Sequence, residues 1–255
     1  MSRRTVALLQ ARTDSSRLPR KVLKTILDKP MIIYQLQRTN QSKYIDELIL
    51  VTSREPSDDE LASTVVQHGF DIYRGNKSNV LKRFYDALKE LKLSEEDIIV
   101  RLTGDCPLHD AVVIDESIKA FINSDCDYLA NSVEPVYPDG LDVEVFNFKS
   151  LNEAYNSATL NSQREHVTPY IRDSGLFKVT NLNREPIHTN WRLTVDEESD
   201  FKLITKIYEH FNSTFFSFSE IVNFLERNQE LLTINNSIQR NEGYLKSLKE
   251  DNNDN

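Results

Sequence analysis

Residues 5–21 read TVALLQARTDSSRLPRK, a short apolar run that leads directly into a basic loop. The run over 5–10 has the length and composition of a buried strand. Two more runs of this kind lie at 47–52 and 97–102, and a helix that Pro30 opens is expected to extend to about Ser42. Continuous apolar strands joined by helices predict an α/β fold whose parallel sheet is covered on both faces.

The rest of the chain extends this alternation before it loosens after residue 138. We expect helices over 57–67, 79–91 and 111–123, with short strands at 71–73 and near Tyr128. Residues 142–146 alternate with period two, which puts Asp142 and Glu144 on one strand face. Further expected elements are helices at about 148–158 and 163–173, a strand or two up to 195, and two C-terminal helices. We predict a single domain over residues 1–248, followed by a frayed polar tail at 249–255.

The composition excludes several classes of protein. Of 255 residues, 39% are hydrophobic and 28% charged, as in ordinary globular domains, and no apolar run is long enough to cross a bilayer. Cys106 and Cys126 cannot form a disulfide framework, and no signal peptide is recognisable, so a cytoplasmic protein is expected. The net charge of −9 disfavours nucleic acid as a partner.

The first 24 residues differ from the rest in charge. They hold seven basic residues and one acid, a net charge of +6, which leaves −15 for the other 231. An arginine- and serine-rich start is compatible with a transit peptide, but the strand expected at 6–9 argues against one. We therefore expect a local anion site at the end of the first strand, where open α/β sheets bind ligands.

The basic loop at 11–21 contains no glycine, so it is neither a Walker A loop nor a dinucleotide fingerprint. Side chains can hold phosphate instead. Arg12 and Arg17 offer planar guanidinium groups that match phosphate oxygens, and Lys21 adds a compact charge. The spacing alone is equally compatible with a solvated basic loop.

A series of ordered motifs resembles the cytidylyltransferase family, which includes the enzymes that activate 3-deoxy-manno-octulosonate and acylneuraminates. The resemblance is closest to the branch of the spore-coat-polysaccharide protein SpsF. The motifs are ARTDSSRLPRK at 11–21, DKPM at 28–31, YRG at 73–75, RLTGDCPL at 101–108, YPDGLDVEVF at 137–146, REHVTPY at 164–170, RLTVD at 192–196 and RNEGY at 240–244.

This resemblance implies a three-layer α/β/α sandwich with a mostly parallel central sheet, of the nucleotide-diphospho-sugar-transferase type. It also implies transfer of CMP from CTP to a sugar or sugar-like acceptor, for surface polysaccharide or glycan synthesis, with Mg²⁺-dependent release of pyrophosphate and a homodimeric enzyme. Arg12, Arg17 and Lys21 then hold and neutralise the triphosphate. The nucleotide-binding set is completed by Leu9, Gln10, Ala11, Ser15, Arg74, Gly75, Thr103 and Gly104.

One position departs from the family pattern. Relatives commonly have glycine between the proline and the lysine of the first motif, where this chain has Arg20. If the position requires a positive φ, Arg20 is strained. Otherwise its side chain can add a phosphate contact.

Two aspartates are candidate metal ligands. Asp105 follows the strand at 97–102 within a glycine turn, and Asp196 follows the run Leu193-x-Val195. Mg²⁺ prefers hard oxygen ligands and usually takes one or two carboxylates plus substrate phosphates. The alternatives are a turn aspartate at 105 and a helix N-cap at 196. Cys106 has no identifiable base beside it, which favours a packing role.

The resemblance suggests Asp142, Glu144, Arg164, Glu165 and His166 as the residues that contact the acceptor. Other interpretations stay open for three of them. Asp142 and Glu144 can be the polar face of a half-exposed strand, and the spacing Ser162-x-x-Glu165 is also that of a capping box. His166 titrates near neutrality and can take the acceptor proton.

Two rival functions come from other classes. A glycosyltransferase of related fold also binds Mg²⁺ with carboxylates. Its diphosphate-sugar substrate needs less positive charge in the site than a triphosphate does, so the basic first loop argues against this function. A binding module without catalysis would have lost Arg12, Lys21 or Asp105, and all three are present.

Overall fold

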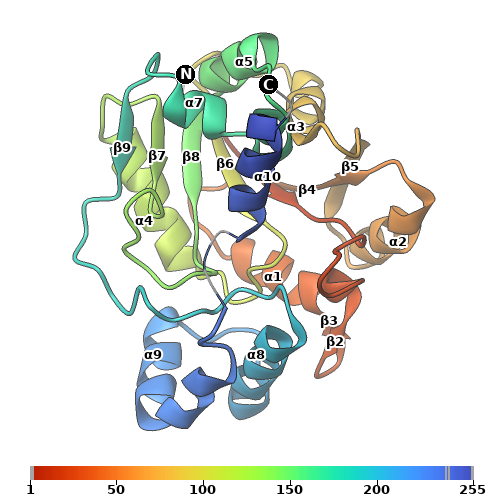
Figure 1. Ribbon diagram of the computed structural model, residues 1–255, viewed down its shortest axis with the longest axis vertical. Helices are drawn as coiled ribbons and strands as arrows, with labels where there is room; N and C mark the ends of the chain where they lie inside the picture. The colour runs from red at the N-terminus through yellow and green to blue at the C-terminus, as the bar shows by residue number, and fades with distance from the viewer. Residues whose placement is uncertain (1–2, 239, 241, 254–255) are drawn as a thin grey trace.

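The structure is a computed structural model that describes residues 3–238, 240 and 242–253 (Figure 1). Within these residues, seven strands form one sheet in the order β5-β4-β1-β6-β8-β7-β9. Four of them are all parallel, and they confirm the parallel sheet predicted from the apolar runs. These four are β1 (Thr5–Gln10), β4 (Glu47–Ser53), β5 (Asp71–Gly75) and β6 (Ile98–Thr103).

The other half of the sheet is mixed. Strand β8 (Glu144–Asn147) runs antiparallel to both β6 and β7 (Tyr128–Ala130), and β9 (Val179–Asn181) pairs parallel with β7 at the edge. A small hairpin of β2 (Thr25–Ile26) and β3 (Lys29–Pro30) follows the basic loop. This mixed half coincides with the part of the sequence where the strand and helix alternation loosens.

Strand β1 shows why its sequence is continuously apolar. Ala7 and Leu9 pack into one hydrophobic core, while Val6 and Leu8 pack into a second core. Successive side chains of a strand point to opposite faces, so both faces of β1 are covered by protein.

Helices cover the two faces of the sheet and produce the predicted three-layer α/β/α sandwich. The first core receives side chains from α1 (Met31–Thr39), α2 (Asp59–Gln67), α4 (Ala111–Ile122), α8 (Glu198–Phe211) and α9 (Phe218–Arg227). The second core receives them from α3 (Val80–Lys89), α5 (Phe148–Ser157) and α7 (Pro169–Asp173). Helix α6 (Asn161–His166) packs against α3, and the short 3₁₀ turns are η1 (Lys21–Leu23), η2 (Pro56–Asp58) and η3 (Gln229–Ile234).

The C-terminal segment corrects one prediction. A helix, α10 (Glu242–Asn253), returns across the front of the sheet and contacts α6 (Figure 1). The frayed tail predicted from residue 249 is therefore wrong for residues 249–253, since Asp251 is buried and accepts a hydrogen bond from the Ser162 amide at 3.3 Å. Residues 254 and 255, and Asn241 of the last motif, lie outside the described residues.

No helix within the described residues is both long and apolar enough to cross a membrane.

Candidate active site

A cavity of about 740 Å³ opens at the carboxyl ends of β1 and β6. Fourteen of the residues predicted for the site line it, although they come from segments far apart in the sequence. They are Gln10, Ala11, Arg12, Ser15, Arg17, Lys21, Thr103, Gly104, Asp105, Asp142, Glu144, Glu165, His166 and Asp196.

Four predicted residues do not line this cavity. Leu9 is completely buried in the core, and Arg164 is exposed on α6. The Arg74 guanidinium donates hydrogen bonds to the carbonyls of Ser53 and Glu55, while Gly75 lines a separate, smaller cavity. The structure therefore gives these four no contact with the main cavity.

Lys21 connects the basic loop to both predicted metal ligands. Its side chain is buried, and its Nζ lies 2.9 Å from the Asp196 carboxylate and 3.8 Å from that of Asp105. The same ammonium donates to the Val195 carbonyl at 2.7 Å. Arg17 Nη2 lies 3.1 Å from Asp196 Oδ1, the same oxygen that Lys21 contacts. Burial opposes ionisation of Asp196, but Lys21 and Arg17 outweigh it and hold the pKa of Asp196 below its ordinary value.

Glycine is required where β1 and β6 end. The Gly104 amide donates to the Gln10 carbonyl at 2.7 Å. A Cβ atom at Gly104 would lie 2.7 Å from Ala11 Cβ and 2.9 Å from the Gln10 oxygen. Only glycine allows this approach, which brings Asp105 to the cavity beside the basic loop.

Asp105 and Asp196 are held together by the backbone. The Asp105 carbonyl accepts hydrogen bonds from the Val195 amide at 2.8 Å and the Thr194 hydroxyl at 3.1 Å. The N-cap alternative for Asp196 is wrong, because Glu197 occupies the N-cap of α8 and the Asp200 carboxylate accepts from the Asp196 amide. Within the described residues, no group of three or more His, Cys, Asp or Glu side chains is placed to hold a metal ion.

Cys106 is fully buried, and burial raises the pKa of its thiol well above the ordinary value. Its Sγ lies 3.3 Å from the Asp105 carboxylate. A neutral thiol in this position packs rather than attacks, as the sequence indicated.

Arg20 adopts the left-handed conformation with φ of 59°. Its side chain does not line the cavity and forms an ion pair with Glu60 at 2.6 Å. Of the two alternatives for Arg20, the strained backbone with positive φ is therefore correct, and the additional phosphate contact is wrong.

Arg83 and Arg192 are site residues that were missing from the sequence-based set. Arg83, on the buried face of α3, donates to the carbonyls of Asn76 and Lys77, and Arg12 also reaches the Lys77 carbonyl at 3.2 Å. Burial lowers the pKa of Arg83 to about 10. An arginine at the same helical spacing as Val80 and Phe84 was the signal that could have found it.

Arg192 is almost fully buried and organises the acidic side of the cavity. Its guanidinium lies 2.9 Å from each of Asp139, Asp196 and Asp200. The alternation of polar residues at 192, 194 and 196 with apolar residues between them could have shown that Arg192 shares a face with Asp196.

Glu144 is buried in the other half of the cavity. It forms an ion pair with Arg101 and accepts hydrogen bonds from the hydroxyls of Tyr128 at 2.5 Å and Thr168 at 2.6 Å. Burial opposes its ionisation, yet these partners hold its pKa below the ordinary value. The alternative of a half-exposed strand face is therefore wrong for Glu144, because the residue is internal and its carboxylate is satisfied by protein groups.

Asp142 precedes β8 and forms an ion pair with Arg240. Burial raises the pKa of Asp142 to about 7, although Arg240 acts in the opposite direction. Its carboxylate lines the cavity close to Asp139 and Asp105, two acids that also raise this pKa.

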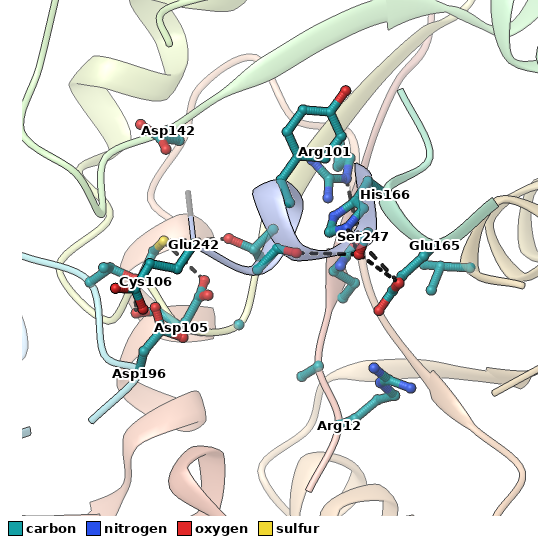
Figure 2. Close-up of a pocket in the computed structure, with 18 of the residues that line it drawn as sticks. Arg12, Arg101, Asp105, Cys106, Asp142, Glu165, His166, Asp196, Glu242 and Ser247 are labelled. Atoms are coloured by element: carbon teal, nitrogen blue, oxygen red, sulfur yellow. Dashed lines mark hydrogen bonds and ion pairs between the residues drawn. The ribbon is translucent and has the colours of Figure 1, made fainter. Parts of the chain in front are cut away.

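Glu165 and His166 lie on the far side of the cavity, together with Ser247 of α10 (Figure 2). The Ser247 hydroxyl is 3.0 Å from His166 Nε2 and donates to Glu165 at 3.1 Å. The capping-box interpretation of Glu165 is wrong, because α6 begins at Asn161 and the Gln163 side chain caps it. Burial, followed by Arg101, lowers the pKa of His166 to about 4 and keeps the ring neutral.

A basic loop after the first strand that faces a pair of carboxylates, on a mostly parallel α/β sheet, defines a nucleotidyltransferase-like protein. The comparison with known families specifies the class further. The chain belongs to the cytidylyltransferase family, whose model, described as "Cytidylyltransferase", matches residues 6–238.

Known relatives agree with this assignment. The spore coat polysaccharide biosynthesis protein SpsF of Bacillus subtilis is 33% identical over 89% of this chain and 95% of its own. A cytidylyltransferase structure from Leptospira borgpetersenii has a TM-score of 0.85 and 28% identity, covering 91% of this chain and 97% of its own. The fold is also shared with CMP:2-keto-3-deoxy-manno-octonic acid synthetase complexed with CTP, at a TM-score of 0.59 and 16% identity over 81% of this chain and 99% of that one.

Proposed function

We propose that this protein transfers CMP from CTP to a sugar-like acceptor and releases pyrophosphate. The observation that carries the proposal is the contact of Lys21 and Arg17 with Asp196, beside Asp105, at the end of β1. Two cations suited to a triphosphate thus adjoin two carboxylates suited to a divalent cation.

The nucleotide half of the cavity is the end nearest β1 and β6. The ends of these strands, at Gln10, Ala11 and Gly104, offer backbone close to the base or ribose, while Arg12 and Ser15 line the same region as Arg17 and Lys21. The CTP named with the structural neighbour supports cytidine as the nucleoside. Arg74 and Gly75 have no part in this proposal, since they do not line the cavity.

Asp105 and Asp196 fit Mg²⁺ as a pair. Both present carboxylate oxygens to the cavity, and both lie within 4 Å of the same ammonium, that of Lys21. Two protein carboxylates leave the remaining positions to water and substrate phosphates, as is usual for this ion. When bound, Mg²⁺ would offset negative charge on the α-phosphate and on departing pyrophosphate.

In the reaction, an acceptor oxygen attacks the α-phosphorus of CTP, a new P–O bond forms, and the bond to pyrophosphate breaks. Negative charge grows on the leaving pyrophosphate, and Lys21 and Arg17 neutralise it from fixed positions. A preorganised contact of this kind typically contributes about 3 kcal/mol to transition-state stabilisation. Lys21 is held in place beforehand by the Val195 carbonyl, which keeps its ammonium at the phosphate position.

The acceptor half is walled by Asp142, Glu165 and His166. A sugar offers hydroxyl groups, and the oxygens of Asp142 and Glu165 are suitable acceptors for them. His166 has a pKa of about 4, which makes it a weak base near neutrality, so a hydrogen-bonding role fits it better than proton removal. Glu144 positions Arg101 and Thr168 rather than contacting the acceptor. The spore-coat function named for the B. subtilis relative supports a surface polysaccharide as the destination of the product.

The experiment measures pyrophosphate release from each of the four nucleoside triphosphates with Mg²⁺, against acidic sugars, sugar phosphates and phosphonates. We expect release with CTP and one class of acceptor, and its loss in Asp105→Ala. Glu198→Ala is the matched control, since it removes an exposed carboxylate that pairs only with Lys24 among the described residues. Hydrolysis of a nucleotide sugar without CTP-dependent pyrophosphate release would instead identify a glycosyltransferase. The homodimer expected from the family is tested separately by sedimentation velocity.

A further inference from the structure

The RNEGY motif at 240–244 has no role in the reaction as proposed so far. It leads into α10, which lies along the cavity and contributes Glu242, Tyr244 and Ser247 to its wall. Figure 2 shows Glu242 on the same side of the cavity as Asp105 and Asp196. This placement puts a third carboxylate beside the proposed phosphate site.

Helix α10 is attached mainly through polar contacts. Ser247 and Asp251 are buried, whereas Leu245 is 48% exposed. Tyr244 accepts a hydrogen bond from Arg172 at 2.8 Å, and its ring lies 5.1 Å from that guanidinium. An element held by few buried apolar groups opens at low free-energy cost, and α10 is such an element.

The Arg17 guanidinium is shared between two carboxylates. Its Nη1 lies 2.9 Å from Glu242 and its Nη2 lies 3.1 Å from Asp196. A guanidinium binds carboxylate and phosphate through the same planar donors. Glu242 therefore occupies donors on Arg17 that a phosphate chain would use.

The two carboxylates are not equivalent. Asp196 also pairs with Lys21 and Arg192, so it keeps two cationic partners when Arg17 turns to phosphate. Among the described residues, Arg17 is the only ion-pair partner of Glu242, whose side chain is 43% exposed. Glu242 can thus leave for solvent at little cost and return when the phosphate departs.

We propose that Glu242 is a counter-ligand of Arg17, which holds the guanidinium in the empty site and competes with the phosphate chain for it. The inference rests on the proposed function, in which Arg17 binds the triphosphate. By lowering the affinity of the site for pyrophosphate, Glu242 speeds release of this product, a step that limits turnover in many enzymes. Glu242 touches Arg17 and not the reacting atoms, so it is a positioning residue.

The test compares Glu242→Gln with Glu250→Gln by calorimetric titration of inorganic pyrophosphate and of cytidine at fixed Mg²⁺ and salt. Both glutamates lie on α10 and line the cavity, but Glu250 pairs with Lys246 and not with Arg17. We expect Glu242→Gln to bind pyrophosphate about three- to tenfold more tightly, because an exposed ion pair and a nearby like charge are both removed. Cytidine carries no phosphate, so its affinity should change less than twofold.

A second comparison assigns the effect to Arg17. In the Arg17→Ala background, Glu242→Gln should change pyrophosphate affinity by less than twofold, because the competing pair no longer exists. Steady-state inhibition by pyrophosphate should strengthen in Glu242→Gln alone, and its salt dependence should become steeper.

Several outcomes would overturn the inference. They are an unchanged or weakened affinity of Glu242→Gln for pyrophosphate, an equal gain in Glu250→Gln, or a full effect without Arg17. Failure of the proposed function has a different signature: the parent protein would bind pyrophosphate and show the Glu242 effect, yet release none from CTP with any acceptor.

Discussion

Lys21 and Asp196 are 175 positions apart in sequence, yet their charged groups lie 2.9 Å from one another in the cavity. Lys21 comes from the loop after the first strand, and Asp196 precedes the helix that completes the acidic side. The pair joins the first motif, at 11–21, to the RLTVD motif at 192–196 in one site. Its formation depends on the sheet, because β1 and β6 bring the loops of residues 11–21 and 104–107 to the same edge.

We predict that Lys21→Met lowers kcat/KM for CTP by a hundredfold or more. A fixed ammonium at the developing phosphate charge typically contributes about 3 kcal/mol, and methionine keeps the length of the side chain without its charge. Steady-state kinetics with CTP check the prediction. Lys24→Met serves as the control, since Lys24 pairs with the exposed Glu198 and should retain activity within twofold. Near-parental turnover of a folded Lys21→Met protein would remove Lys21 from the mechanism.

The sequence predicted the parallel sheet and the basic loop at its edge because both depend on local signals, whereas most of the predicted residues that line the cavity came from the resemblance to the cytidylyltransferase family. The apolar run at 5–10 identifies a strand with two buried faces, and charged residues just after such strands gather at one edge of the sheet. Arg192 and Arg83 were not predicted as site residues, because a buried charge depends on partners from distant segments of the chain. Asp139 and Asp200 form ion pairs with Arg192, and no local pattern around residue 192 predicts those partners.

Helix α10 was missed for a related reason. Its sequence has few apolar residues, so its helical period is weak and its polar composition is typical of a frayed end. The helix is held instead by polar groups of other segments, such as the Ser162 amide, which donates a hydrogen bond to the Asp251 carboxylate. Arg74 is a different case: the resemblance placed it in the nucleotide-binding set, but its guanidinium donates hydrogen bonds to the carbonyls of Ser53 and Glu55.

We predict that Gly140→Ala strongly destabilises the fold. Gly140 has φ of +103°, and a Cβ atom there would lie 2.4 Å from the Leu193 carbonyl carbon. The change strains the turn and separates Asp139 from Arg192, at an expected cost of about 3 kcal/mol or more. Urea unfolding followed by circular dichroism measures the loss. Gly175→Ala is the control, since φ is +75° but no atom lies within 4 Å, so the expected cost is only about 1 kcal/mol.

We predict that His109→Gln reduces the acid sensitivity of the fold. His109 is fully buried between Gln35 and the Asp142 carbonyl, and burial lowers its pKa to about 4. Between pH 4 and 6.5 the unfolded chain therefore binds more protons at this residue than the native protein does. Its contribution to stability rises with pH over that window and is lost as the pH falls through it.

Urea midpoints of the parent and the His109→Gln variant at pH 4.5, 5.5 and 7 test this. The stability difference between the two proteins should shift in favour of the variant as the pH falls. Comparing the two proteins at each pH removes most of the contribution of Asp142, whose raised pKa acts in the opposite direction. A difference that is the same at all three pH values would contradict a neutral, buried His109.

We predict that Arg192→Met destabilises the protein by about 3–5 kcal/mol, the usual cost of removing one partner from a buried charge cluster. The Asp200 carboxylate would lose its guanidinium, and Asp139 would keep Arg240 at 3.9 Å. Among the described residues, the ion pairs left to Asp196 would be those with Lys21 and Arg17. Chemical unfolding gives the free energy, and Arg184→Met, which breaks a more exposed pair with Glu116, should cost about 1 kcal/mol or less. Because uncompensated acids take up protons, the Arg192→Met defect should shrink as the pH is lowered toward 5. A defect that grows toward acid pH would mean that Arg192 stabilises the fold through packing of its side chain and not through the charge it supplies to the three aspartates.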